Sequence, residues 1–344
     1  MNTGFEEKYF CAVNSGDGFV GFYPLITDDA ERIFIIKGGP GTGKSHFMRE
    51  VAKAAEKSGK RVVYYYCSSD PDSIDAISID KKTFLLDGTA PHSVDASLPG
   101  VRDEIINLGS FWDSCTLSDQ SKIIKPLCES KALCFSRTYR CLSAAKSAAL
   151  AIDMTVRPAL LLEKLSGASK RALRDIPDGY NYTENTVALN SYGMKGRVKF
   201  DTLKDIAKEY ISVSDDYGTA HLFFAELIAE TKRKRLSITV SKDPLNPDKI
   251  DALRIDCINR VYEAGEGGDR HINMHRFLDH GQIKSTRNEL KELNKLKESA
   301  EVAALRALSS AAKYHFTLEE IYGKAMDFSA KEKYCKEFIQ KLFK

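Results

Sequence analysis

The sequence predicts an α/β protein built by tandem duplication, in which each half has a mostly parallel sheet flanked by helices and an appended helical hairpin. Three observations predict this fold. Strand, helix and strand signals alternate in the first part of each half, which is typical of a parallel sheet with helical crossovers. Apolar residues follow a helical period in the second part. Short strings also recur in the same order along the chain.

The recurring strings define the repeat. Residues 70–80 read DPDSIDAISID, and residues 243–256 read DPLNPDKIDALRID. Further along, IINLGSFWD at 105–113 matches HINMHRFLD at 271–279, and the string SAAK occurs in both halves. Because single short matches arise by chance but an ordered series does not, we expect two copies of one fold.

The repeat predicts two domains, 1–178 and 195–344, joined by a linker at 179–194 that is rich in Asn, Gly, Tyr and Thr. The hairpins should occupy about 118–175 and about 280–343. Both rest on one-faced apolar stripes: Leu142, Ala145, Ala149, Ile152 and Val156 in the first half, and Leu290, Leu293, Leu296, Ala300, Ala303 and Ala307 in the second.

Composition excludes several classes of protein. The 344 residues are 43% hydrophobic and 29% charged, and the net charge of +3 predicts neither a nucleic-acid surface nor a membrane surface. No apolar run reaches the ~18 residues that span a bilayer, and the N-terminus lacks the pattern of a signal peptide. The eight cysteines are scattered without a CxxC pair. We therefore expect a cytoplasmic protein with reduced thiols and no structural metal.

One motif carries chemistry. Residues 33–45 read IFIIKGGPGTGKS, a complete P-loop between an apolar strand and a helical segment. Its glycines let successive backbone N–H groups point at phosphate oxygens, and the helix N-terminus adds a positive dipole end. Lys44 would reach the β- and γ-phosphates, and the Ser45 hydroxyl would bind Mg²⁺. The predicted nucleotide-binding residues are Gly38, Gly39, Pro40, Gly41, Thr42, Gly43, Lys44, Ser45 and His46.

Such a site also needs a carboxylate for Mg²⁺, at the end of a strand beside the P-loop strand. Asp87 ends a buried-strand run and is favoured, although an Asp-Gly turn would explain it without a function. Asp70, after the preceding strand, is the alternative. His92 is predicted to sense the γ-phosphate, position water or act as a base, or else to be an ordinary loop hydrogen-bonding residue. Lys37 is expected to be a solvated or ligand-facing charge. The predicted catalytic residues are Lys44, Asp87 and His92.

The second copy lacks these features. The P-loop segment aligns without a gap with residues 214–224, where the lysine becomes His221 and the magnesium-binding hydroxyl becomes Leu222. Asp215 and Asp216 place negative charge where phosphates would lie, and like charges at that distance cost on the order of 4 kcal/mol. We therefore predict an active site in the first half and a degenerate one in the second.

Residues present in both halves are predicted to serve the fold, because only the first half keeps the P-loop. Asp87 is aligned opposite Glu263, so the second half has a glutamate where the first half has this aspartate. The shared pairs are Asp70 and Asp243, Asp75 and Asp251, Asp80 and Asp256, Asn107 and Asn273, and Asp113 and Asp279.

The strings GGPGTGKS, SSDPDSIDAI, DGTAPH and INLGSFWD together resemble an uncharacterised family of bacterial tandem P-loop ATPase-like proteins, mostly from Firmicutes. The resemblance covers nearly the whole chain, including the duplication. It implies ATP binding, and it implies a P-loop in each half, from which this sequence departs at 214–222.

We therefore expect the first half to bind Mg·ATP and to hydrolyse it slowly, with a basic residue supplied in cis by the second half. The alternatives are a nucleotide or small-molecule kinase, and an ATP-controlled switch that docks a protein partner through the helical hairpins. No base-reading Asn-Lys-x-Asp motif is present, which favours ATP over GTP. We expect no contact with membranes or nucleic acid.

Overall fold

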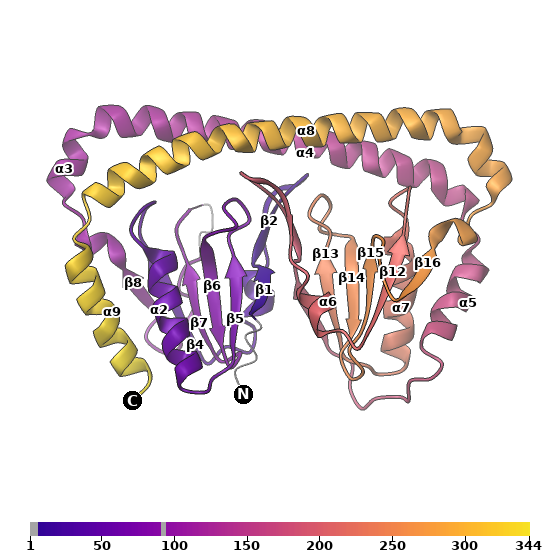
Figure 1. Cartoon of the computed structure of the whole chain (residues 1–344), viewed down its shortest axis with the longest axis horizontal. Helices are drawn as coiled ribbons and strands as arrows, with labels where there is room; N and C mark the ends of the chain where they lie inside the picture. The colour runs from indigo at the N-terminus through magenta and orange to yellow at the C-terminus, as the bar shows by residue number, and fades with distance from the viewer. Residues whose placement is uncertain (1–5, 91–93) are drawn as a thin grey trace.

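The computed structural model describes residues 6–90 and 94–344 and contains two six-stranded mixed sheets (Figure 1). The first sheet has the order β1-β5-β6-β7-β4-β8, and β6 alone runs antiparallel to its neighbours. Its strands are β1 (Glu7–Phe10), β4 (Arg32–Lys37), β5 (Val62–Tyr66), β6 (Ile74–Ile79), β7 (Thr83–Asp87) and β8 (Asp103–Asn107).

The second sheet repeats this order strand for strand, as β9-β13-β14-β15-β12-β16, with β14 antiparallel. The predicted fold class, two similar mostly parallel sheets flanked by helices, is therefore confirmed. The strands are β9 (Glu184–Val187), β12 (Glu209–Ser214), β13 (Ile238–Lys242), β14 (Ile250–Ile255), β15 (Arg260–Ala264) and β16 (Arg270–Asn273).

Each sheet is accompanied by the same small elements. In the first half these are a hairpin of β2 (Ala12–Ser15) and β3 (Gly18–Gly21), then α1 (Tyr23–Ile26) and α2 (Lys44–Lys57). In the second half they are a hairpin of β10 (Asn190–Gly193) and β11 (Gly196–Lys199), then α6 (Thr202–Ile206) and α7 (Ala220–Arg233). The predicted linker at 179–194 therefore contains strands, which its polar composition concealed because β9 is a largely exposed edge strand.

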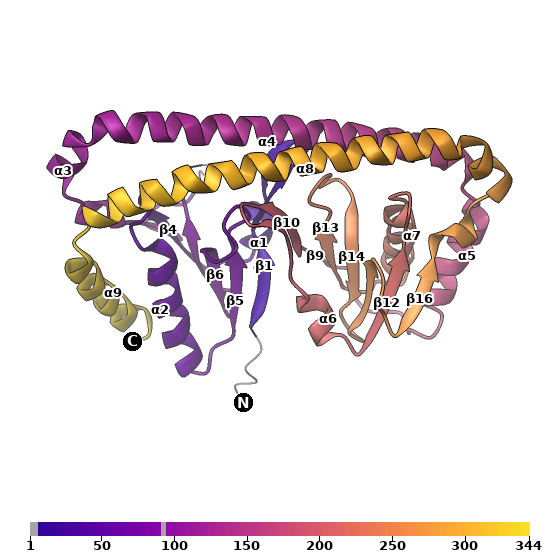
Figure 2. The ribbon, with the colours of Figure 1, turned by 45° about the horizontal axis from the view of Figure 1, so that its top comes forward.

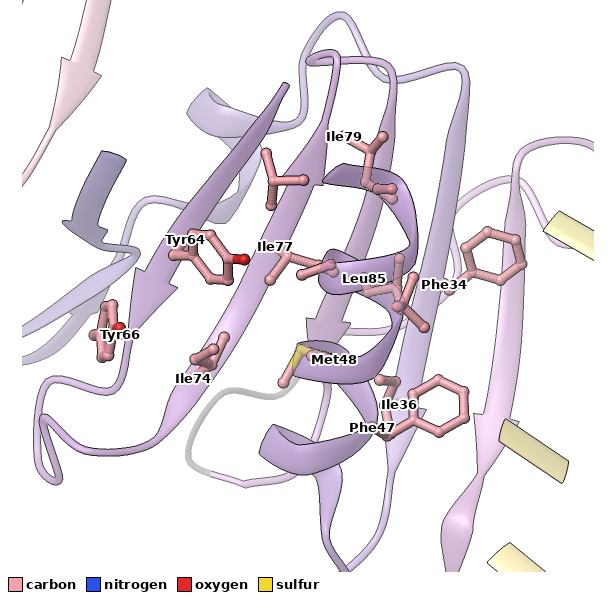
Figure 3. Close-up of a cluster of buried hydrophobic side chains, with 14 of the residues drawn as sticks. Phe34, Ile36, Phe47, Met48, Tyr64, Tyr66, Ile74, Ile77, Ile79 and Leu85 are labelled. Carbon is pink, nitrogen blue, oxygen red and sulfur yellow. The ribbon is translucent and has the colours of Figure 1, made fainter. Parts of the chain in front are cut away.

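The first core explains why this segment forms a strand followed by a helix. All four residues Ile33 to Ile36 are buried, as expected for a central parallel strand covered on both faces. Helix α2 places Phe47, Met48 and Val51 on one face, and Figure 3 shows this helix lying over the side chains of the sheet. The P-loop is thus held between a buried strand and a buried helix face.

Two of the shared residue pairs serve the fold, as predicted. Asn107 and Asn273 each accept a backbone N–H at the start of a 3₁₀ turn, η1 (Leu108–Phe111) and η3 (Met274–Phe277). Asp113 and Asp279 cap α3 (Ser114–Asp119) and α8 (His280–Lys324) through two backbone N–H groups each. These short side chains satisfy amides that the helices leave without partners.

The appended helices differ from the expected separate hairpins. Helix α4 (Ser121–Val156) and helix α8 are long and lie side by side, antiparallel, across both halves (Figures 1 and 2). Their apolar stripes face each other: the buried residues Leu142 and Ala145 of α4 belong to the same cluster as Ala304 and Leu308 of α8. None of the helices in the described part of the chain combines the length and the apolar character that crossing a bilayer requires.

The helices that follow are exchanged between the halves. After η2 (Arg157–Ala159), α5 (Leu162–Ala172) packs against α7 of the second half. The C-terminal α9 (Phe328–Leu342) packs against α2 of the first half, where the Phe338 ring lies 4.9 Å from that of Phe34 and 5.3 Å from that of Phe47. Each core is therefore completed by a helix from the other repeat.

Candidate nucleotide-binding site

The P-loop connects β4 to α2 in a conformation that only glycine adopts without strain. Gly41 and Gly43 have φ values of 70° and 78°. Within residues 6–90 and 94–344, the backbone amides of Gly41, Thr42 and Gly43 meet no acceptor. Because amides in a tight loop at a helix N-terminus attract anions, the loop is arranged to accept phosphate oxygens.

Lys44 and Asp87, two of the predicted site residues, lie side by side. Asp87 ends β7, which pairs in parallel with the P-loop strand, and its carboxylate lies 3.5 Å from the Lys44 ammonium. The Lys44 ammonium also donates to the carbonyl oxygens of Gly38 and Gly39 at 2.8 Å each. Asp87 is 8% exposed and accepts a hydrogen bond from the Thr89 amide. A buried ion pair therefore lies at the mouth of the loop.

The other predicted magnesium ligands are engaged locally. The Ser45 hydroxyl oxygen accepts a hydrogen bond from the Ile74 amide at 3.0 Å. The Asp70 carboxylate accepts from Ser73 at 3.0 Å and from the Asp72 amide at 3.4 Å, so it closes its own turn. Both carboxylates accept the amide two residues ahead in the chain, but Asp87 also pairs with Lys44.

His92 lies outside the described residues, but the chain on either side of it is anchored. The Lys37 ammonium donates to the carbonyl oxygens of Gly88 and Val94, at 2.8 and 2.9 Å, and pairs with Asp95. Lys37 is therefore a structural tie and not a solvated charge. In the sequence, the one indication that Lys37 would hold neighbouring loops together is its position at the end of a buried central strand.

The ends of the second repeat cover the P-loop. The Gly41 backbone touches α8 so closely that an added Cβ would collide with the Glu319 carbonyl oxygen. A Cβ on Gly39 would lie 3.1 Å from the Trp112 ring, which itself packs 5.5 Å from the ring of Tyr322. The sequence could not reveal this contact, because the loop and α8 lie far apart in the chain.

Cations from several elements approach the loop. Lys331 of α9 is 2% exposed, and its ammonium lies 3.5 Å from His46 Nδ1. Within the described part of the chain Lys331 meets no carboxylate. Burial lowers the pKa of Lys131 of α4, and a hydrogen bond from His315, helped by the charges of Lys44 and Lys131, lowers the pKa of Glu319. Lys331 of α9 and Lys131 of α4 therefore lie near the loop, with the Glu319 carboxylate of α8 between the lysine charges.

The equivalent loop in the second half contains its own anion. The Asp215 carboxylate accepts from the Tyr217 amide at 3.2 Å, from the Thr219 hydroxyl at 3.0 Å and from the Ala220 amide. Gly218 keeps the positive φ of Gly41. Because a carboxylate already occupies the loop donors, a phosphate would have to displace it.

Strand register corrects two of the aligned pairs. Ile36 pairs with Asp87 in the first sheet, and Val213 pairs with Ala264 in the second, so Ala264 and not Glu263 stands opposite Asp87. The turn hydrogen bonds likewise place Asn246, not Asp243, opposite Asp70. The pairing of Asp70 with Asp243 rested on an Asp-Pro string that lies three residues out of register, and the pairing of Asp87 with Glu263 was one residue out of register. The second half thus lacks the strand-end carboxylate altogether.

The lysine position of the second half is also altered. His221 Nδ1 lies 2.8 Å from the Gly218 carbonyl oxygen, and Nε2 lies 3.5 Å from Asp153 of α4. Burial lowers the pKa of His221, which favours the neutral ring. A neutral imidazole cannot replace the charge of a P-loop lysine.

Comparison with known proteins gives one match. The family model described as "Nephrocystin 3, N-terminal" matches residues 23–79, which include the P-loop, α2 and β5. No curated protein and no solved structure matches. The match covers a small part of the chain. With the two sheets, it supports two P-loop-like α/β domains, while the resemblance to the bacterial tandem family stays a prediction.

Proposed function

We propose that the chain is a Mg²⁺-dependent ATP-binding P-loop NTPase with one live site, in the first half, that hydrolyses ATP slowly. The observation that carries the proposal is the contrast between the two loops. The first has amides without acceptors beside a Lys44–Asp87 pair, whereas Asp215 fills the second. The absence of a guanine-reading motif favours ATP.

The residues have separate roles in this proposal. The amides of Gly41 to Lys44 and the Lys44 ammonium hold the phosphate chain, and charge that develops on it is stabilised by donors already fixed in the loop. Ser45 and Asp87 offer the hydroxyl and carboxylate oxygens that Mg²⁺ prefers, so the residues fit the ion. Bound there, Mg²⁺ would neutralise charge on the β- and γ-phosphates.

Lys331 is the basic residue that the second repeat supplies in cis. A buried ammonium without a carboxylate is costly, and a phosphate oxygen would offset that cost. An added Cβ on Gly43 would lie 3.3 Å from the Lys331 ammonium, which is also 3.5 Å from His46 Nδ1, so Lys331 lies beside the start of α2, where phosphate oxygens would bind. Lys331→Met should weaken ATP binding or slow turnover, whereas exposed Lys333→Met should change neither.

The deciding experiment is calorimetric titration of Mg·ATP into the full chain, with turnover measured on the same samples. We expect one site per chain. Lys44→Ala should weaken binding by roughly 10- to 100-fold because a charge-assisted hydrogen bond is lost. His221→Ala, the matched change in the second half, should leave binding intact. Two sites, or one that survives Lys44→Ala, would refute the proposal.

The cover over the loop favours a second candidate, an ATP-controlled switch. Helix α8 touches Gly41 through its backbone, so a nucleotide that moves the loop must also move α8. Trp112 is the only tryptophan and lies at this contact, so its fluorescence reports on it directly. Tight ATP binding with negligible turnover and a large fluorescence change would favour the switch over the ATPase.

A further inference from the structure

A basic pocket lies in the second half, away from both loops. It has a volume of about 480 Å³ and lies between α5 and the strands β12, β15 and β16, where Arg260 and Arg270 begin β15 and β16. Five arginines and a histidine line it: Arg171, Arg174, Arg260, Arg270, Arg276 and His271. Nothing in the proposed nucleotide chemistry uses this pocket.

The carboxylates of the pocket balance only part of its charge. Arg260 forms two hydrogen bonds with Asp175, at 2.9 and 3.2 Å, and also pairs with Glu209. Arg270 shares Glu209. Among residues 6–90 and 94–344, the remaining three guanidinium groups meet no carboxylate: Arg171, Arg174 and Arg276. Because arginine stays protonated, the pocket holds excess positive charge.

The first half shows that the fold does not need these cations. The 3₁₀ caps Asn107 and Asn273 align the two edge strands, so Arg270 corresponds to Glu104. Equivalent bridges at Met326 and Leu160 align the two exchanged helices. By the same alignments, Arg276 corresponds to Ser110, Arg171 to Glu337 and Arg174 to Gln340. The basic set is therefore particular to the second half.

We propose that this pocket binds a compact polyanion, a small molecule with two or more phosphate groups. Guanidinium groups pair with phosphate oxygens in a bidentate geometry, which suits clustered charge. The volume lies within the range of small-molecule sites. A nucleic-acid strand is disfavoured, because a strand follows an extended basic stripe and the whole chain carries a net charge of only +3.

The test uses inorganic tripolyphosphate titrated into the full-length Lys44→Ala chain, so that the P-loop contributes little. We expect binding at one site that weakens as salt rises. Adding Arg174→Ala or Arg276→Ala should each reduce affinity on the order of tenfold, since each removes a charge-assisted contact. Arg306→Ala, an exposed arginine of α8, is the matched control and should have no effect.

The outcomes separate this inference from the proposed function. If Lys44→Ala alone abolishes tripolyphosphate binding, or if the arginine changes leave it unaltered, the pocket does not bind polyanions, while the P-loop proposal stands. If a single-stranded oligonucleotide binds more tightly as its length increases and tripolyphosphate does not compete, the ligand is nucleic acid and the inference of a compact ligand is overturned. Circular dichroism and melting of each variant establish that it is folded.

Discussion

Phe338→Ala tests whether α9 truly belongs to the first core. The Phe338 side chain is 8% exposed and packs on Phe34 and Phe47, both in the first half. Replacing a buried phenylalanine by alanine lowers the free energy of unfolding by about 3–5 kcal/mol, and this figure includes the loss of its contacts with neighbouring rings. With a urea slope of about 3 kcal/mol per molar, the midpoint of the affected transition should fall by about 1–2 M.

The assay is urea unfolding followed by Trp112 fluorescence, with ATP affinity measured in parallel. Trp112 contacts the P-loop at Gly39 and packs on Tyr322, so it reports on the first core and its cover. The matched variant is Leu165→Ala, a buried leucine of α5 in the core of the second half. We expect Phe338→Ala to shift the Trp112 transition and weaken ATP binding, and Leu165→Ala to do so far less.

The opposite result would refute the exchange. By sequence alone, α5 belongs to the first repeat and α9 to the second. If Leu165→Ala destabilised the Trp112 transition and Phe338→Ala left it unchanged, each repeat would be packed with its own helix. Equal shifts from both variants would show that the two halves unfold as one unit, and ATP affinity alone would then assign the helices.

Three further predictions concern single residues. Gly41→Ala should lower the melting temperature and change Trp112 fluorescence, because a Cβ at φ 70° is strained and collides with α8; unchanged melting and fluorescence would contradict the contact. Burial raises the pKa of Asp251 from 3.8 to about 7, so its contribution to stability is full below pH 4 and is lost as the pH rises through 7. Relative to wild type, Asp251→Asn should therefore gain up to about 4 kcal/mol between pH 4 and pH 8, measured by denaturation; a constant difference would show an ordinary pKa. Asp87→Asn should retain ATP binding without Mg²⁺ but lose Mg²⁺-dependent turnover on the order of a hundredfold, and normal turnover would exclude it as a ligand.

Local sequence predicted the P-loop because that loop depends on residues next to each other. The glycines at 41 and 43, the buried strand before them and the apolar helix face after them all follow from a short stretch. The carboxylate at the end of the neighbouring strand could also be predicted. An apolar run ends in Asp87, and parallel strands bring their carboxyl ends to the same edge of the sheet. The caps at Asp113 and Asp279 are likewise local.

The packing of α8 and α9 over the P-loop could not be predicted from the sequence. A stripe of apolar residues shows that a helix buries one face, but it does not show against which half. Lys331 is one of four lysines in α9; the other three are exposed, and it is the packing of the helix that buries Lys331. The linker was misjudged for a related reason, since an edge strand such as β9 lacks an apolar pattern.

The exchange of helices also determines how the chain crosses from one half to the other. Both α5 and β9 pack in the second half of the molecule. The segment at 179–183, which lies between them in sequence, therefore does not connect one half to the other. The covalent crossings are α4 and α8 themselves, of 36 and 45 residues, or about 54 and 68 Å of helix. A protease that cuts at 179–183 would therefore yield two fragments that copurify as a nicked protein, each still clasped by a helix of the other.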